Sequence, residues 1–274
     1  MVVINYSDCD DSEQTSGTSV LCVTDLCAGY AGQRNAILDV NFEVNKGELI
    51  GVIGPNGAGK STLFKALVGI IPHSAGVVSV KSADCASSHQ MIGYVSQYDE
   101  VNWQFPATVF DVVMMGRARK IGWFRFPSRR DREAVNAALE QVGMLHLSSR
   151  QISELSGGQK RRVFIARTLA QETDLLLLDE PFTGVDPAAE DDIMETLERL
   201  NQSGITLMIS THDLNRAATT FDRLIMLNQT VIAVGAPEDV LTTDLLKHAY
   251  GGLISVLPNT TDRPALIISD LHIG

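Results

Sequence analysis

Short apolar runs alternate with segments of helical periodicity along most of this chain. Three such runs stand out: residues 49–53 (LIGVI), 175–178 (LLLL) and 204–210 (GITLMIS). Runs of this length without alternation are typical of strands buried on both faces. Between them apolar residues recur at helical spacing, as in Ile193, Leu197 and Leu200. Strands that alternate with helices predict an α/β fold whose parallel sheet is covered on both faces.

Other segments carry different patterns. Residues 21–26 (LCVTDL) are strand-like in composition, and residues 37–44 (ILDVNFEV) alternate apolar and polar positions, which predicts strands. Residues 131–144 (DREAVNAALEQVGM) predict an amphipathic helix, with acidic residues at its start and Gly143 near its end. Residues 1–18 are polar and acidic, so we expect a disordered tail there.

One segment, residues 101–117 (VNWQFPATVFDVVMMGR), is unusually apolar and aromatic for an acidic chain. It contains Trp103, Phe105 and Phe110, followed by a run of two valines and two methionines. The ordinary interpretation is that such a run belongs to the core of the chain itself. A partner that binds part of the segment is the alternative.

Composition narrows the class of protein. The 274 residues carry a formal charge of −11 and 45% hydrophobic residues. The charge argues against a broad nucleic-acid-binding face, and no run approaches the ~18 apolar residues of a membrane span. The first basic residue is Arg34, so the positive start of a signal peptide is missing. The four cysteines form no C-x-x-C pair, which predicts reduced structural thiols in a cytosolic protein: Cys9, Cys22, Cys27 and Cys85. Zinc binding by Cys22 and Cys27 is disfavoured because the usual ligand spacing is absent.

The strongest motif is residues 54–62, which fit G-x-x-x-x-G-K-[ST] between a predicted strand and a predicted helix. Its residues are Gly54, Pro55, Asn56, Gly57, Ala58, Gly59, Lys60, Ser61 and Thr62. Glycines let backbone N–H groups close around a phosphate, and the helix directs its positive dipole end at that phosphate. We expect Lys60 to reach the β- and γ-phosphates and Ser61 to ligate Mg²⁺. The strand and helix context disfavours a glycine-rich turn that binds nothing.

A second motif follows the four leucines of residues 175–178. Asp179 and Glu180 come at the carboxyl end of this predicted strand, where open α/β sheets bind ligands. We expect Asp179 to hold Mg²⁺, directly or through water, and Glu180 to act as general base toward the attacking water. On this motif alone, an ordinary strand end is an equally good interpretation.

A third motif is LSGGQKRR, residues 155–162. Ser156 and Gln159 fit a capping box at a helix start. Gly157 and Gly158 are poor helix formers in a first turn, so they indicate that something approaches this backbone closely. The exposed N–H groups of a helix start suit a phosphate.

Three further residues are weaker candidates. His212 follows the third apolar strand, where it would sense the γ-phosphate and hold the attacking water. Gln97 ends another strand-like run and would reach the metal ion and the water. Tyr30 would stack on adenine.

The order of these motifs along residues 20–250 resembles the nucleotide-binding subunit of ATP-binding cassette (ABC) transporters. The resemblance implies a RecA-like P-loop NTPase core, an antiparallel β subdomain and an α-helical signature subdomain at about residues 98–168. Residues 19–250 would form the ATPase domain, and residues 251–274 a C-terminal extension of unassigned role. The implied cofactors are ATP and Mg²⁺. Tyr30 then stacks on adenine, Gln97 belongs to the Q-loop, residues 156–159 form the signature, Asp186 belongs to the D-loop and His212 is the switch histidine. The D-loop departs from the commoner Ser-Ala-Leu-Asp, since it reads Thr183, Gly184, Val185, Asp186.

The same resemblance implies partners. In this family two cassettes pack head to tail, and the signature of each completes the ATP site of the other, so a homodimer is expected. The segment between the Q-loop and the signature receives a coupling helix of a membrane permease, which assigns Trp103, Phe105 and Phe110 partly to that contact. The expected location is the cytoplasmic face of the cell membrane, bound to the permease.

The amino-acid sequences of several segments are similar to those of ATPases from importers for manganese, zinc or chelated iron. The similarity is nearest to the manganese type. Such importers also use an extracytoplasmic metal-binding protein. The transported ion cannot be read from this chain, because the ATPase does not touch it. A soluble ABC ATPase of iron–sulfur assembly stays open, and membrane association would discriminate. The repair and translation types lack support, since this chain has neither a long coiled-coil insertion nor a second cassette. The signature and His212 argue against a P-loop kinase or GTPase, and an exporter subunit would commonly be fused to membrane spans.

Overall fold

The computed structural model describes residues 19–30, 36–80, 92–96, 106–122, 125–251, 254–257 and 265–268. The chain forms two compact units. The first unit comprises residues 1–81 and 208–274, and the second comprises residues 82–207. Within the described ranges, no helix is long and apolar enough to span a bilayer. The expected tail, together with Gln97, Trp103 and Phe105, lies outside these ranges.

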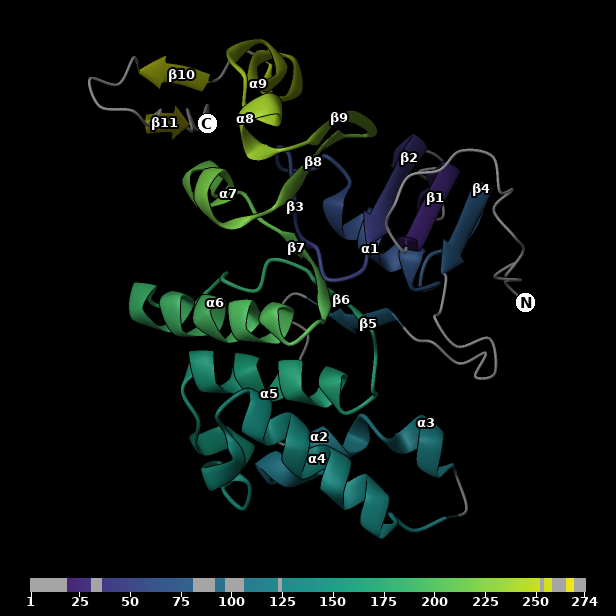
Figure 1. Cartoon of the computed structure of the whole chain (residues 1–274), viewed down its shortest axis with the longest axis vertical. Coiled ribbons are helices and arrows are strands. Elements are labelled where there is room, and N and C mark those ends of the chain that lie inside the picture. Colours follow the sequence, from purple (N-terminus) through teal and green to yellow (C-terminus); the bar gives the residue numbers. More distant parts are fainter. Residues whose placement is uncertain are drawn as a thin grey trace. The chain divides into compact units, whose positions relative to one another are not determined.

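An antiparallel sheet forms one layer of the first unit (Figure 1). Its strands, in spatial order, are β2 (Ile37–Asn45), β1 (Ser19–Ala28) and β4 (His73–Val80). Every second residue of β2 is buried along most of the strand, as the alternation in its sequence predicts. Cys27 on β1 is a buried free thiol, and its Sγ accepts a hydrogen bond from the backbone N–H of Asp39. Among the described side chains, no group of three or more His, Cys, Asp or Glu residues is arranged to hold a metal ion.

The first unit also contains the strand that leads into the phosphate-binding motif. β3 (Leu49–Ile53) is buried along its whole length and pairs in parallel with β8 (Arg223–Asn228). β8 pairs with antiparallel β9 (Thr230–Gly235). The remaining elements of this unit are α1 (Lys60–Leu67), α7 (Leu214–Thr220), α8 (Pro237–Val240), α9 (Thr243–Tyr250), β10 (Ile254–Leu257) and β11 (Ala265–Ile268). The last two strands form an antiparallel hairpin, so the apolar residues near the C-terminus include a strand.

Helices dominate the second unit (Figure 1). They are α2 (Val109–Met115), α3 (Ala118–Ile121), α4 (Arg129–Gln141), α5 (Gly157–Leu169) and α6 (Pro187–Gln202), with 3₁₀ turns at Leu145–Leu147 and Ile152–Glu154. α2, α4 and α5 pack against one another, and α5 also packs against α6. Two parallel strands belong to this unit, β5 (Ile92–Val95) and β6 (Leu175–Leu178). β7 (Thr206–Ser210) crosses the boundary between the units.

Side-chain caps explain where several of these helices begin. Thr108 begins α2, Ser128 begins α4 and Ser156 begins α5, each through a reciprocal capping box. Asp186 begins α6 by accepting a hydrogen bond from the N–H of Ala189. Each cap satisfies an N–H group that would otherwise lack an intrahelical partner. The predicted helix at residues 131–144 is confirmed, and it begins two residues earlier because Ser128 supplies the cap.

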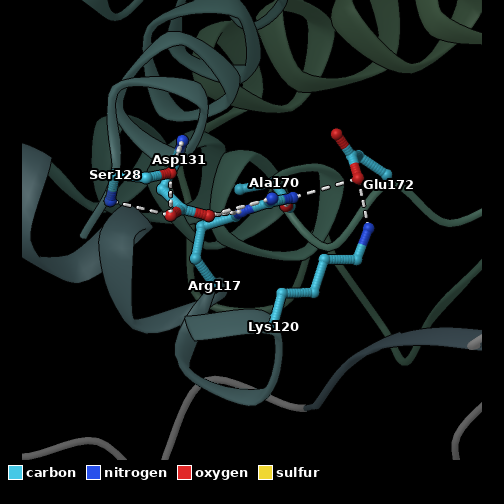
Figure 2. Close-up of polar contacts among 6 residues, drawn as sticks. All are labelled: Arg117, Lys120, Ser128, Asp131, Ala170 and Glu172. Carbon is cyan, nitrogen blue, oxygen red and sulfur yellow. Dashed lines mark hydrogen bonds and ion pairs between the residues drawn. The ribbon is translucent and has the colours of Figure 1, made fainter. Parts of the chain in front are cut away.

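A cluster of charged residues around the buried Arg117 joins several helices of the second unit (Figure 2). Arg117 follows α2 and is only 3% exposed. Its guanidinium contacts Asp131 of α4 at 3.0 Å, Glu172 at 3.1 Å and the carbonyl of Ala170 at 2.9 Å. Lys120 of α3 also pairs with Glu172. Because these partners come from α2, α3, α4 and the end of α5, the cluster fixes the arrangement of the helices in this unit.

Candidate active site

The phosphate-binding motif forms a tight loop between β3 and α1 in the first unit. Gly54 adopts φ 154°, and a Cβ at that position would lie 2.1 Å from the carbonyl oxygen of Leu227. Gly59 adopts φ 98°, and a Cβ there would lie 2.5 Å from a side-chain atom of Ile37. Only glycine fits either position without displacing its neighbours. The predicted glycine-rich loop between a strand and a helix is therefore confirmed.

The start of α1 has the chemistry of an anion site. Gly59 precedes it, no side chain caps it, and no acidic residue occurs in its first turn. This differs from α2, α4, α5 and α6, which all have side-chain caps. The first N–H groups of α1 have no intrahelical partner, so they and the helix dipole favour a phosphate at this end.

Lys60 supplies the cation of the loop. The residue is buried, with only 6% of its surface exposed. The ammonium donates hydrogen bonds to the carbonyl oxygens of Gly54 at 2.7 Å and Pro55 at 3.2 Å. The charge is thus held at the mouth of the same loop, within reach of an anion bound there. Ser61 follows in the first helical turn and is partly exposed, which suits a metal-ligating hydroxyl.

Two other candidates lie in the first unit. The N–H of Thr211 donates to the carbonyl of Val52 on β3, so His212 follows β7 beside the end of the strand that enters the phosphate loop. His212 is exposed, and the next residue, Asp213, caps α7. Tyr30 is 45% exposed, and the ammonium of Lys65 on α1 lies 6.0 Å from the centroid of its ring. An exposed ring beside α1 is available for stacking.

The paired carboxylates lie in the second unit, where β6 ends. Asp179 is 2% exposed; its N–H donates to the carbonyl of Val95, and the Tyr94 hydroxyl donates to its Oδ2 at 3.3 Å. Glu180 follows with φ 45°, a left-handed conformation that is uncommon outside glycine and often occurs at functional sites. Asp179 provides the oxygen ligand that Mg²⁺ prefers, and Glu180 presents a carboxylate next to it.

Two residues fix Glu180 that the sequence pattern did not single out. The Thr183 hydroxyl donates to Glu180 Oε2 at 3.1 Å. Arg161 of α5 is 1% exposed and donates to the carbonyl oxygens of Glu180 and Ser96, each at 3.3 Å. Ser96 is the residue before Gln97, so Arg161 joins the chain at the predicted Q-loop to the chain at the predicted base. Thr183 occupies one of the positions where the sequence of the predicted D-loop departs from the common pattern.

The signature residues begin α5, and their two glycines differ. Ser156 and Gln159 form the capping box, as one interpretation of the sequence predicted. A Cβ on Gly158 would lie 2.7 Å from the Cβ of Ala189 on α6, so packing within this chain explains that glycine. A Cβ on Gly157 would have an ordinary contact of 3.6 Å with Val185. No packing within the described part of the unit requires glycine at 157.

The predicted site residues thus fall into two sets. The phosphate loop, Tyr30 and His212 lie in the first unit. Asp179, Glu180, Asp186 and the signature lie in the second unit. Asp186 is exposed at the start of α6, where its side chain accepts from the N–H of Ala189.

Comparison with known proteins identifies the family of this chain. Residues 37–183 match the family model described as ABC transporter. The zinc transport system ATP-binding protein TroB of Treponema pallidum (strain Nichols) is 45% identical over 233 residues, 85% of this chain and 87% of that protein. The manganese transport system ATP-binding protein MntA of Synechocystis sp. (strain ATCC 27184 / PCC 6803 / Kazusa) is 45% identical over 235 residues, 85% and 90% of the two chains.

Solved structures agree with these relatives. An inward-facing metal-chelate type ABC transporter superimposes with a TM-score of 0.78 at 30% identity, over 91% of this chain and 97% of that chain. An ATP-binding cassette of an ABC transporter in its ADP conformation superimposes with a TM-score of 0.72 at 27% identity, over 86% and 99% of the two chains. The predicted mixed α/β cassette fold is therefore confirmed.

Proposed function

Because this chain belongs to the ABC transporter family and is one of its ATP-hydrolysing cassettes, we propose that it powers a membrane importer of divalent metal ions, with manganese as the first candidate cargo. The proposal about cargo comes from relatives at about 45% identity over most of the chain. The relatives also include the chelated iron transport system protein YfeB of Yersinia pestis, at 45% identity over 236 residues, 85% of this chain and 80% of that protein. Zinc and chelated iron are therefore the alternative cargoes.

The observation that carries the ATPase mechanism is the phosphate loop with its uncapped helix start. In the proposed mechanism the N–H groups at the start of α1 bind the β-phosphate, and Lys60 exchanges its loop carbonyls for phosphate oxygens. Mg²⁺, when bound, neutralises charge on the phosphates; Ser61 and Asp179 would hold it, together with Gln97. These side chains have the hydroxyl, carboxylate and amide oxygens that Mg²⁺ prefers.

Glu180 is the proposed general base. Its carboxylate accepts a hydrogen bond from the Thr183 hydroxyl at Oε2, which orients the carboxyl group. The buried Arg161 holds the Glu180 carbonyl and thereby limits the movement of this residue. His212 would sense the γ-phosphate, as the switch histidine of this family. Positioning a base in this way typically contributes about 10² to 10⁴ in rate.

The signature would act on the ATP site of a second copy. Gly157 at the exposed start of α5 is the residue that the packing of its own chain does not explain. We infer that a γ-phosphate held by the second copy approaches this backbone, with Ser156 and the first N–H groups of α5 as donors. Asp186 and the residues around it would line the same dimer contact.

The permease contact would use a hollow on the helical unit. A groove of about 350 Å³ is lined by Asp111, Met114, Met115, Ala118, Ile121, Gly122, Arg125 and Pro127. α2 supplies both core and groove: Val109 and Val113 are fully buried, whereas Met115 is 49% exposed. Phe110 is half-buried. Flexible methionines suit a surface that receives a partner helix. In this proposal residues 101–117 therefore both pack the unit and bind the permease.

Hydrolysis by purified chain tests the mechanism. Glu180→Gln should bind MgATP like the wild type, hydrolyse it at least about a hundredfold more slowly, and accumulate as a dimer with ATP. Glu198→Gln, an exposed residue on α6, is the matched control and should hydrolyse normally. Near wild-type turnover of Glu180→Gln would remove this residue as the base.

Association with membranes tests the transporter role against a soluble iron–sulfur assembly ATPase. Met115→Asp should lower co-purification with the membrane fraction of the cells while leaving ATP binding intact. Leu145→Asp, at a residue 37% exposed outside the groove, is the control and should change neither. A wild-type chain found wholly in the soluble fraction would favour the soluble alternative.

A further inference from the structure

A positively charged segment interrupts this acidic chain. Residues 117–132 carry seven basic side chains and one acidic side chain, a formal charge of +6. The remainder of the chain carries 15 basic and 32 acidic side chains, a formal charge of −17. The segment spans α3, the loop after it and the start of α4. Its charge is therefore opposite in sign to that of the chain as a whole.

Part of this charge is used within the unit. Arg117 is buried on Asp131, and Lys120 pairs with Glu172 (Figure 2). Arg129 pairs with Glu133 at 2.7 Å, although both side chains are largely exposed. Arg125, Arg130 and Arg132 are exposed, and within the ranges that the structure describes they form no ion pair. Three cations consequently remain at the surface without a charged partner in the described unit.

The position of two of these cations is unfavourable for the helix that carries them. Arg130 and Arg132 lie in the first turn of α4, at the positive end of its dipole. The dipole there is already complemented by Asp131 in its capping box with Ser128. Basic side chains at this end do not help α4 to form. An external anion would relieve both the mutual repulsion of the arginines and their repulsion by the helix start.

An exposed aromatic side chain lies among the arginines. Phe126 is 95% exposed, the most exposed of the large apolar side chains in the described ranges. It is flanked by Arg125 and Pro127, which both line the groove beside α2 and α3. Aromatic rings flanked by basic residues are enriched where proteins meet the headgroup region of a bilayer. A single ring outside the groove suits a fluid, planar surface better than a shaped protein pocket.

We propose that Arg125, Phe126, Arg130 and Arg132 form a surface that binds anionic phospholipid bilayers. The arginines contact lipid phosphates, and Phe126 enters the headgroup region. The contact goes beyond the proposed transport function, because it requires neither a permease nor a particular cargo. It would orient the helical unit at the membrane, with the groove next to the bilayer surface.

Binding of the purified full-length chain to vesicles tests this surface. Vesicles of phosphatidylcholine are compared with vesicles of equal parts phosphatidylcholine and phosphatidylglycerol, at low and at high salt. The wild-type chain should bind the anionic vesicles preferentially, and salt should weaken the binding. Each arginine near an anionic surface contributes about fivefold in partitioning, so Arg125→Gln, Arg130→Gln and Arg132→Gln together should lower it about a hundredfold. Phe126→Ser alone should lower it about tenfold.

A matched variant removes the same charge elsewhere. Arg150→Gln, Arg199→Gln and Lys247→Gln together replace three exposed basic residues outside the segment and should lower vesicle binding far less. ATP binding, measured for every variant, reports folding, and exposed substitutions of this kind should leave it unchanged. Equal binding to both kinds of vesicle, or equal losses in the two triple variants, would overturn the proposal. A triple variant that keeps vesicle binding but loses permease-containing membranes would also overturn it, because the partner would then be an acidic protein surface.

Discussion

Replacing Arg117 by methionine should destabilise the helical unit strongly. The substitution keeps an unbranched apolar stem of similar length and removes the guanidinium. That group is 3% exposed and contacts Asp131, Glu172 and the Ala170 carbonyl (Figure 2). All three partners would remain after the change, so the effect depends on how far each partner can be solvated without Arg117.

The three partners differ in this respect. Ala170 is 1% exposed, and a buried carbonyl that loses its donor costs about 1–3 kcal/mol. The Asp131 side chain is 11% exposed and would keep only its bonds to Ser128. The Glu172 side chain is 44% exposed and would keep Lys120, so its contribution is small. Removing one member of a buried ion pair typically costs about 3–5 kcal/mol, which is the expected total.

The acidic partners add a pH dependence. Hydrogen bonds from the Ser128 hydroxyl and N–H, followed by the effect of Arg117, hold the pKa of Asp131 below its usual value despite burial. Partial burial acts to raise the pKa of Glu172, but Lys120 and Arg117 outweigh it and lower that pKa. Since both folded-state pKa values are depressed, this stabilisation is present above about pH 4 and is lost as the pH falls through the folded values. The variant should show a shallower acid loss than the wild type.

Hydrogen exchange of the α4 and α5 amides measures this effect locally, so the two units need not unfold together. Arg150→Met is the control, because Arg150 pairs with Glu154 while both side chains are about half exposed. It should cost less than about 1 kcal/mol. Adding Asp131→Asn to Arg117→Met should cost less than the sum of the single effects, because the stranded charge is then removed. An Arg117→Met effect no larger than that of Arg150→Met would refute the reasoning.

Three further predictions concern the two signature glycines, the Thr183 hydroxyl and the buried Tyr250. Gly158→Ala should destabilise the chain by about 1–3 kcal/mol in urea unfolding, because its Cβ would meet Ala189 at 2.7 Å. Gly157→Ala should leave stability unchanged and slow ATP hydrolysis; equal stability losses would contradict the distinction between the two glycines. Thr183→Val should lower kcat about five- to tenfold through loss of its bond to Glu180, whereas Thr183→Ser should retain activity, and an unchanged kcat in the valine variant would exclude this positioning. Burial raises the pKa of Tyr250 to about 12, with a smaller opposing effect of the Gly54 backbone. The neutral form is thus favoured in the fold, so stability should fall by roughly 2 kcal/mol as the pH rises from about 10 to 12, and Tyr250→Phe should remove that fall.

The sequence predicted the elements whose patterns are local. β3, β6 and β7 are continuous apolar runs, and the spacing of Ile193, Leu197 and Leu200 matches the buried face of α6. The phosphate loop was equally clear, because its motif is contiguous in the sequence, although Leu227 and Ile37 make the contacts that require Gly54 and Gly59. His73–Val80 was not predicted as a strand, since four successive residues within it are exposed and its alternation is weak.

Features set by contacts between distant segments could not be read in advance. Arg161 belongs to a polar stretch that looks like a solvated helix face. It is nevertheless buried and donates hydrogen bonds to the carbonyl oxygens of Ser96 and Glu180. The different reasons for Gly157 and Gly158 depend on Ala189 of another helix. The apolar residues of α2 lie on two faces of the helix. Which of them belong to the core and which line the groove depends on the positions of the neighbouring helices.

Metal uptake by cells tests whether this chain powers a metal importer. Cells that lack the native copy would carry either the wild-type chain or Glu180→Gln, with manganese, zinc or iron supplied alone at limiting concentration. The variant should selectively lose uptake of one metal, with manganese expected first. Selective loss of zinc or iron uptake would keep the importer function and correct its cargo. Equal uptake of all three metals by the two strains would contradict the claim that this chain powers their import.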